Sequence, residues 1–183
     1  MNGILKNVKN NCDMHSVAPF AAFAISNVDF NFVEPFGSTF FLPSVILSEV
    51  EAGVGTGGTL SGIGEVLKAQ NPSIEIWAVE PKNAAILAGG TVGTHLQMGI
   101  GDGLIPDNLN TQIYSHICVV SDEEALGCAR DLARKEGLMA GISAGTNVFA
   151  ALKLAKRLGP GKTVVTILPD TAERYFSTPL FEE

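Results

Sequence analysis

The sequence predicts an α/β protein in which a parallel sheet is flanked by helices. Three observations lead to this prediction: a glycine-rich run that leads directly into a helix-forming segment, short apolar segments typical of buried strands, and amphipathic helices between those segments. The chain has 183 residues, of which 46% are hydrophobic and 17% are charged. This composition supports a domain with a buried core and is untypical of a disordered chain.

The regular pattern begins near residue 47. Residues 1–46 are rich in Phe and Asn and follow neither a helical nor a strand period. We therefore divide the chain into a leader, 1–46, and an α/β domain, 47–183. The leader contains a weak apolar run at 17–25, but Pro19 interrupts it, so an ordinary N-terminus is favoured over a signal peptide.

Short apolar segments predict three strands. The residues at 74–79, 117–120 and 163–168 are largely apolar or β-branched, and turn residues bound them. The last of these segments is almost continuously apolar, which is typical of a strand buried on both faces of a parallel sheet.

Two helices have clear ends in the sequence. Ser121 and Glu124 fit a capping box at the start of one helix, and Gly137 ends it. The other helix is expected from about Gly145 to Leu158, where a Gly-Pro-Gly sequence stops it. Both segments place apolar residues three and four positions apart, so each helix should bury one face.

The most informative segment is the run Gly-Val-Gly-Thr-Gly-Gly-Thr-Leu-Ser-Gly-Ile-Gly at 53–64. A backbone with few Cβ atoms can turn its N–H groups inward around an anion. A helix N-terminus directly behind such a loop adds unpaired N–H groups and the positive end of the helix dipole. The run therefore predicts a phosphate site, for a nucleotide, a sugar phosphate or pyridoxal 5′-phosphate.

A dinucleotide is one candidate for this phosphate site. Gly53, Gly55 and Gly58 satisfy the pattern G-x-G-x-x-G, and Glu80 follows at a distance suited to a ribose-binding acid. The pattern arises easily in a run this rich in glycine, and the segment 48–52 carries two acids where a buried first strand should be apolar. A Rossmann NAD-binding protein therefore stays an alternative.

The chain also resembles the fold-type II pyridoxal-phosphate enzymes, in particular cysteine synthase (O-acetylserine sulfhydrylase) and cystathionine β-synthase. The resemblance extends from residue 52 to residue 181, and several motifs occur in the family's order, which is more specific than one glycine pattern. The motifs are Gly55-Thr56-Gly57-Gly58-Thr59, Ala78-Val79-Glu80-Pro81, the segment from His95 to Pro106, Gly141-Ile142-Ser143-Ala144-Gly145, Ile167-Leu168-Pro169-Asp170, and Glu173-Arg174-Tyr175.

The resemblance implies a site for pyridoxal 5′-phosphate. The backbone N–H groups of Gly55 to Thr59, with the two threonine hydroxyls, would hold the cofactor phosphate. Ser143 would hydrogen-bond to the pyridine nitrogen, and a neutral hydroxyl there moderates the electron sink and suits β-elimination and β-replacement. On the residues alone, Ser143 could equally be the cap of the following helix.

The resemblance also implies the residues around the substrate and the ring. Gly99, Ile100 and Gly101 would line the substrate side of the site, and Pro169 and Asp170 would close the ring site. On the residues alone, the first three could belong to an ordinary loop, and Asp170 could begin a helix.

The sequence departs from the family pattern in its lysines. The family's Schiff-base lysine lies in a Ser-Val-Lys-Asp-Arg type segment, and its substrate carboxylate binds a Ser/Thr-Ser-Gly-Asn-Thr type loop; neither segment occurs here. The eight lysines have other contexts: Lys6, Lys9, Lys68, Lys82, Lys135, Lys153, Lys156 and Lys162. We therefore assign no catalytic residue and expect an incomplete fold, with β-replacement nearly abolished in a truncated form.

Charge and cysteine content restrict the partners. The net charge of −7 and the pI near 4.9 argue against nucleic acid or an anionic membrane as a partner. The three cysteines, Cys12, Cys118 and Cys128, lack metal-ligand spacing and are odd in number, which indicates the reducing cytoplasm and no metal site.

The resemblance implies a role in cysteine biosynthesis, with O-acetylserine and sulfide giving cysteine and acetate. The partners would then be a small amino-acid substrate and a second copy of the chain in a homodimer. The alternative is a non-catalytic module that binds pyridoxal phosphate or regulates a full-length synthase by pairing with it.

Overall fold

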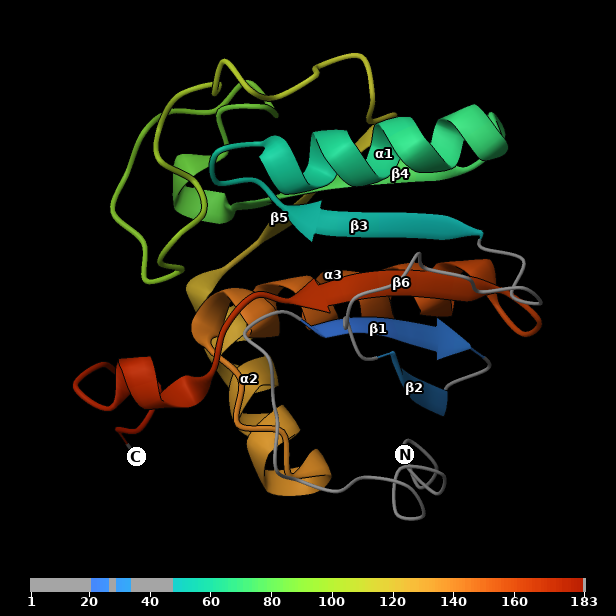
Figure 1. Ribbon diagram of the computed structural model, residues 1–183. Helices are drawn as coiled ribbons and strands as arrows, with labels where there is room; N and C mark the ends of the chain where they lie inside the picture. The colour runs from blue at the N-terminus through green and yellow to red at the C-terminus, as the bar shows by residue number, and fades with distance from the viewer. Residues whose placement is uncertain (1–20, 27–28, 34–47, 183) are drawn as a thin grey trace.

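The computed structural model describes residues 21–26, 29–33 and 48–182 (Figure 1). For β1 and β2 the description covers the backbone alone. In chain order the elements are β1 (Ala21–Ser26), β2 (Asp29–Val33), β3 (Glu49–Gly53), α1 (Gly58–Gln70), β4 (Glu75–Pro81), the 3₁₀ helix η2 (Lys82–Ala84), β5 (His116–Val120), α2 (Asp122–Glu136), α3 (Ile142–Leu158), β6 (Thr163–Leu168) and the 3₁₀ helix η3 (Ala172–Tyr175).

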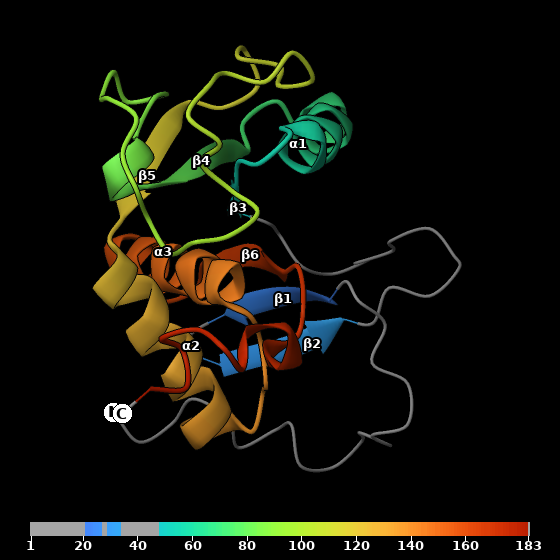
Figure 2. The same ribbon diagram turned by 90° about the vertical axis from the view of Figure 1, so that its left-hand side faces the viewer.

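The described strands form one sheet in the order β2-β1-β6-β3-β4-β5. The strands β6, β3, β4 and β5 are parallel, which confirms the predicted α/β class and the strands expected at 74–79, 117–120 and 163–168. Helix α1 packs on one face of the sheet, and α2 and α3 pack on the other, as Figures 1 and 2 show. Both faces of the parallel strands are therefore buried.

The segment 48–52 carries two acids, which argued against a buried strand in the sequence. Both acids lie in β3, a buried central strand of the sheet. In β3, Glu49 is 3% exposed and Glu51 is 0% exposed. Both side chains lie on the face that α3 covers, where the guanidinium of Arg157 lies 2.6 Å from a carboxylate oxygen of Glu49. Burial raises the pKa of Glu51 well above its ordinary value, because the charged form is poorly solvated inside the protein.

Helix α3 begins three residues earlier than the sequence predicted. Its N-cap is Gly141, so Ser143 lies in the first turn and does not cap the helix. The prediction placed the start at Gly145, but this glycine serves the contact between α2 and α3. A Cβ atom at Gly145 would lie 2.2 Å from the carbonyl oxygen of Ala125 in α2.

Helix α2 has both predicted ends. The hydroxyl of Ser121 accepts a hydrogen bond from the backbone N–H of Glu124, and the carboxylate of Glu124 accepts one from the N–H of Ser121. Gly137 follows the helix in the left-handed conformation, with φ of 71°. The capping box and the glycine stop are therefore confirmed.

Part of the leader extends the sheet. Strand β1 pairs antiparallel with β6 from Ala21↔Leu168 to Ser26↔Thr163, and β2 pairs antiparallel with β1. We found no strand period in this region of the sequence, but β2, Asp-Phe-Asn-Phe-Val, does alternate polar and apolar residues, a signal that we overlooked. The boundary at residue 46 stays a prediction, and Cys12 and Pro19 lie outside the described residues.

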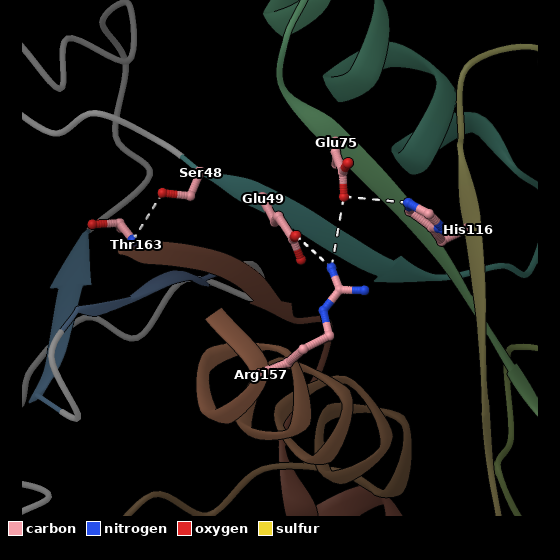
Figure 3. A network of polar contacts seen from close by, with 6 residues as sticks. All are labelled: Ser48, Glu49, Glu75, His116, Arg157 and Thr163. Atoms are coloured by element: carbon pink, nitrogen blue, oxygen red, sulfur yellow. Dashed lines mark hydrogen bonds and ion pairs between the residues drawn. The ribbon is translucent and has the colours of Figure 1, made fainter. Parts of the chain in front are cut away.

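A polar network joins the N-terminal ends of three parallel strands (Figure 3). The guanidinium of Arg157 in α3 lies between Glu49 of β3 and Glu75 of β4, at 2.6 Å and 3.6 Å, and Nε2 of His116 in β5 lies 3.2 Å from Glu75. The guanidinium also lies over the ring of Trp77, at 4.5 Å from its centroid. The network thus fixes the end of the sheet opposite the glycine run.

Candidate functional site

The predicted site residues meet at the carboxyl ends of the parallel strands. The glycine run follows β3, and Pro169 and Asp170 follow β6, whose arrowheads point the same way in Figure 1. Ser143 lies in the first turn of α3, at the same end of the sheet. Ligands of open α/β sheets bind at this edge, so the fold brings the predicted phosphate and ring segments together.

The glycine run forms a tight turn against a second loop. Gly57 is the N-cap of α1 and has a φ of 82°, which favours glycine. A Cβ atom at Gly55 would lie 2.3 Å from the carbonyl oxygen of Gly99, and one at Gly57 would lie 2.6 Å from Cβ of Leu109. Both glycines are therefore required where the two loops approach each other.

The start of α1 has the properties of an anion site. No side chain caps this helix, and no acidic residue lies in its first turn. The side chains of Thr56 and Thr59 are exposed, and Ser143 is 4% exposed. Within the described part of the chain these three hydroxyls have no hydrogen-bond partner, so they are free to bind a ligand.

The substrate-side loop is fixed to the glycine run by backbone contacts. The N–H of Gly101 donates to the carbonyl oxygen of Val54 at 2.9 Å, and Nε2 of His95 lies 3.0 Å from the carbonyl oxygen of Gly101. Ile100 is 6% exposed and packs near Gly53. Gly99, Ile100 and Gly101 therefore lie beside the glycine run, and their role on the substrate side stays a prediction.

Sequence reasoning missed Gln97, which anchors this loop from inside. Its side chain is 0% exposed. The amide nitrogen donates to the carbonyl oxygen of Val120 and to the carboxylate of Asp122, and the amide oxygen accepts from the hydroxyl of Thr146 in α3. A signal existed in the sequence, because an isolated glutamine within the glycine-rich segment from His95 to Pro106 is a candidate anchor for that loop.

Asp170 lies against the segment that carries Ser143. Its backbone carbonyl accepts from the N–H of Gly141 at 3.2 Å, and its carboxylate accepts from the hydroxyl of Tyr175. A Cβ atom at Gly141 would lie 2.1 Å from the Asp170 carboxylate, so this approach also needs glycine. Burial raises the pKa of Asp170 above its ordinary value.

Glu80 is held inside the protein. Its two carboxylate oxygens accept hydrogen bonds from the backbone N–H groups of Leu87, at 2.9 Å, and Ala88, at 2.8 Å. The residue is 2% exposed. The acid that a dinucleotide would need for its ribose is therefore committed to the loop that follows β4, and the Rossmann alternative loses its supporting residue.

Asn147 is a further residue that the sequence analysis did not single out. It lies in α3, four residues after Ser143, and is 2% exposed. Its amide oxygen accepts from the N–H of Gly53, and its amide nitrogen donates to the carbonyl oxygen of Ile167. The available signal was an amide side chain among the small and apolar residues of this helix.

Metal and thiol chemistry have no support in the described part of the chain. No group of three or more His, Cys, Asp or Glu side chains there could hold a metal ion. Cys118 and Cys128 are free thiols, and burial raises the pKa of Cys128 to about 12, which makes it a poor nucleophile. Among the described residues, no helix is long and apolar enough to cross a membrane.

The comparison with protein families agrees with this geometry. The family model described as pyridoxal-phosphate dependent enzyme matches residues 47–170, which include the glycine run, Ser143 and Asp170. The chain belongs to this family. Pyridoxal phosphate is the cofactor of the family, so the predicted relationship and cofactor class are confirmed.

Proteins similar to this chain include cysteine synthases and a cystathionine β-synthase. Cysteine synthase from Staphylococcus aureus is 54% identical over 130 residues, which are 71% of this chain and 42% of that protein. Cysteine synthase from Entamoeba histolytica has a similar structure, with a TM-score of 0.73 and 38% identity over 75% of this chain and 41% of the other. O-acetylserine dependent cystathionine β-synthase from Helicobacter pylori has a TM-score of 0.70 and 41% identity over 74% and 44% of the two chains. The chain therefore spans about two fifths of the length of these relatives.

Proposed function

We propose that the chain binds pyridoxal 5′-phosphate and forms the phosphate, pyridine and substrate-side parts of a cysteine synthase-type site. The observation that carries the proposal is the meeting of three segments at one edge of the sheet: the loop from Gly55 to Thr59, the helix start at Ser143, and the pair Pro169 and Asp170. The uncapped start of α1 and the hydroxyls of Thr56, Thr59 and Ser143, which have no partner among the described residues, support the proposal.

The residues fit the phosphate group. The first-turn N–H groups of α1 have no partner within the helix and no capping side chain, so they can donate to phosphate oxygens. The hydroxyls of Thr56 and Thr59 add two donors that no other described group engages. An acidic chain with a net charge of −7 attracts anions poorly at long range, so these local donors determine the affinity.

The residues also fit the ring. Ser143 is 4% exposed, and its hydroxyl has no hydrogen-bond partner among the described residues, so it can donate to the pyridine nitrogen without transferring a proton to it. When bound, pyridoxal phosphate provides an electron sink that stabilises negative charge on the α-carbon of an amino acid. The chain's own contribution is to hold and orient the ring, through Ser143 on one side and the loop of Gly99, Ile100 and Gly101 on the other.

The reaction that these parts suit is β-replacement in cysteine biosynthesis, from O-acetylserine and sulfide to cysteine and acetate. The relatives' names support this choice. The sequence lacks the family's lysine motif, and Lys68 lies in the last turn of α1, away from the glycine run. We therefore propose that this chain alone binds the cofactor but does not complete the reaction.

A binding experiment with a matched control tests the phosphate site. Pyridoxine 5′-phosphate is a suitable ligand because it lacks the aldehyde that would react with surface lysines. We expect saturable 1:1 binding, lost in Gly57→Ala because the added Cβ would lie 2.6 Å from Leu109. Gly89→Ala is the control, since Gly89 also has a positive φ, of 81°, but no atom within 4 Å of the added Cβ. No binding by the wild type, or equal binding by both variants, would contradict the proposed site.

A second candidate function is pairing with a full-length synthase as a cofactor-binding or regulatory module. Exposed apolar side chains in the connection between β4 and β5 favour this candidate: Val92 is 66%, Met98 50%, Leu104 60% and Ile105 52% exposed. Exposed apolar side chains that gather on one surface are typical of a protein interface. Light scattering of the chain alone and mixed with a full-length cysteine synthase distinguishes a monomer, a homodimer and a mixed complex.

The reducing cytoplasm is the location that we propose. The free thiols of Cys118 and Cys128 support it, because free buried cysteines are typical of reducing compartments. Fractionation of cells followed by detection of the chain checks this proposal.

A further inference from the structure

Asn147 links the backbone next to two segments on which the proposed cofactor site depends. These are the phosphate loop, residues 55–59, and the ring segment, Pro169 and Asp170. The amide oxygen of Asn147 accepts from the N–H of Gly53 at 2.9 Å, two residues before the phosphate loop. Its amide nitrogen donates to the carbonyl oxygen of Ile167 at 2.8 Å, two residues before Pro169. Because one contact needs an acceptor and the other a donor, the orientation of the amide group is determined.

The connection lies where the ladder between two strands stops. Strands β3 and β6 pair in parallel at Glu49↔Val164 and Val50↔Val165, and the pairing does not continue to their carboxyl ends. Gly53 and Ile167 lie beyond the last pair, and the N–H of Gly53 and the carbonyl of Ile167 bond to the Asn147 amide. The Asn147 amide fills the role of the missing ladder hydrogen bonds and sets how far apart the two ends lie.

The packing around this amide leaves little freedom. Asn147 is 2% exposed. A Cβ atom at Gly53 would lie 3.0 Å from the Asn147 amide oxygen and 3.0 Å from Cγ2 of Ile100. The substrate-side loop therefore packs on the same point, and a shift of the amide would be transmitted to the start of the glycine run.

We infer that Asn147 is a positioning residue that fixes the distance between the phosphate loop and the ring segment. This inference rests on the proposed function. Asn147 acts through the backbone at Gly53 and Ile167 and needs no contact with the cofactor itself. A ligand that spans both segments should therefore depend on Asn147, while a ligand that touches the phosphate loop alone should not.

Two ligands separate this role from a general role in folding. Pyridoxine 5′-phosphate spans the phosphate loop and the ring segment, and inorganic phosphate occupies the phosphate loop alone. We expect Asn147→Ala to weaken binding of pyridoxine 5′-phosphate about tenfold, since two buried backbone groups lose their partner, and to change binding of phosphate less than about threefold. Calorimetry measures the first affinity, and ³¹P NMR titration measures the second.

Val148→Ala is the matched control. Val148 is the next residue of α3, is 1% exposed and packs in the hydrophobic core, so its truncation lowers stability without touching either segment. This variant should bind both ligands as the wild type does, with folding checked by the fluorescence of Trp77, the single tryptophan of the chain. Asn147→Ser is a second variant, whose shorter side chain cannot reach both partners and should show the same selective loss.

The outcomes separate the inference from the proposed function. Selective loss of pyridoxine 5′-phosphate in both Asn147 variants supports the inference. Parallel loss of both ligands, no loss of either, or failure of both variants to fold contradicts it and assigns Asn147 to stability alone. Absence of binding by the wild type would overturn the proposed function itself, and the inference with it.

Discussion

The carboxyl group of Glu51 lies inside the protein, in the centre of a parallel strand. The residue is 0% exposed. Burial disfavours the charged form and raises the pKa of this group well above its ordinary value, which the nearby hydroxyl of Thr166 offsets only in part. Glu49, two residues earlier, differs because Arg157 lies against it. One strand therefore holds two buried glutamates, of which Glu49 has a cationic partner and Glu51 has none among the causes of its pKa shift.

The raised pKa of Glu51 makes stability depend on pH. The group is neutral in both states below the ordinary value of 4.5, so its full contribution is present there. As pH rises toward the folded-state pKa, the unfolded chain loses its proton first, and stability falls. We expect Glu51→Leu to be about 1–3 kcal/mol more stable than the wild type at pH 8.5 and much closer to it at pH 5.

Urea unfolding at the two pH values checks this expectation, with the m-value as a test that the same transition is compared. An equal difference between wild type and variant at both pH values would show that Glu51 is charged in the folded state or that packing alone decides its effect.

At the scale of elements, the packing of helices α2 and α3 determines how Ser143 is placed. They approach closely because Gly145 has no side chain: a Cβ atom there would lie 2.2 Å from the carbonyl oxygen of Ala125 and 2.8 Å from Cβ of Ala129. Helix α3 begins with Gly141 and Ser143, so this contact also positions the first turn that faces the ring.

Two glycine-to-alanine substitutions test the importance of this contact. Gly145→Ala should destabilise the protein by about 1–3 kcal/mol, because backbone and side-chain atoms of α2 must move. Gly127→Ala is the control in α2, where no atom lies within 4 Å of the added Cβ, and it should stabilise by up to about 1 kcal/mol through helix propensity. Thermal unfolding measures both, and equal shifts of Tm would contradict the role assigned to Gly145.

The elements with local signals could be predicted, and those that depend on tertiary contacts could not. Ser121, Glu124 and Gly137 define α2 by hydrogen bonds within a few residues, and the prediction was right at both ends. The start of α3 was wrong because Gly145 serves a contact with another helix. The acids of β3 seemed to oppose a buried strand, because the pairing of Glu49 with Arg157 and the raised pKa of Glu51 both depend on tertiary contacts.

For the site too, the sequence predicted the features with local signals and missed those that depend on contacts across the fold. The glycine run contains its own signal for a phosphate, but the glycines at 55 and 57 are required by Gly99 and Leu109, which are distant in sequence. Gln97 and Asn147 were missed because their importance lies in which backbone groups they reach across the fold. The roles assigned to Ser143 and to the other site residues stay predictions.

At the scale of the whole molecule, the net charge of −7 opposes the binding of an anionic cofactor. Affinity for phosphate at the proposed site therefore comes from helix N–H groups and hydroxyls at short range. Raising the salt concentration screens the long-range repulsion and leaves these short contacts in place.

The affinity for pyridoxine 5′-phosphate should therefore rise slightly, by about twofold, between about 0.05 M and about 0.5 M NaCl. Calorimetric titrations at the two salt concentrations measure this change. A tenfold loss of affinity at high salt would instead indicate that exposed lysine or arginine side chains hold the phosphate.

The central proposal is that this chain holds pyridoxal 5′-phosphate at the glycine run but lacks a lysine placed to react with it. The direct measurement is the visible absorption spectrum after incubation with pyridoxal phosphate and gel filtration, followed by borohydride reduction and peptide mapping. We predict cofactor that is released on further dilution, with any reduced label scattered over exposed lysines such as Lys82 and Lys162. A stable yellow band with label on one lysine would contradict the proposal, because that residue would then act as the family's missing lysine.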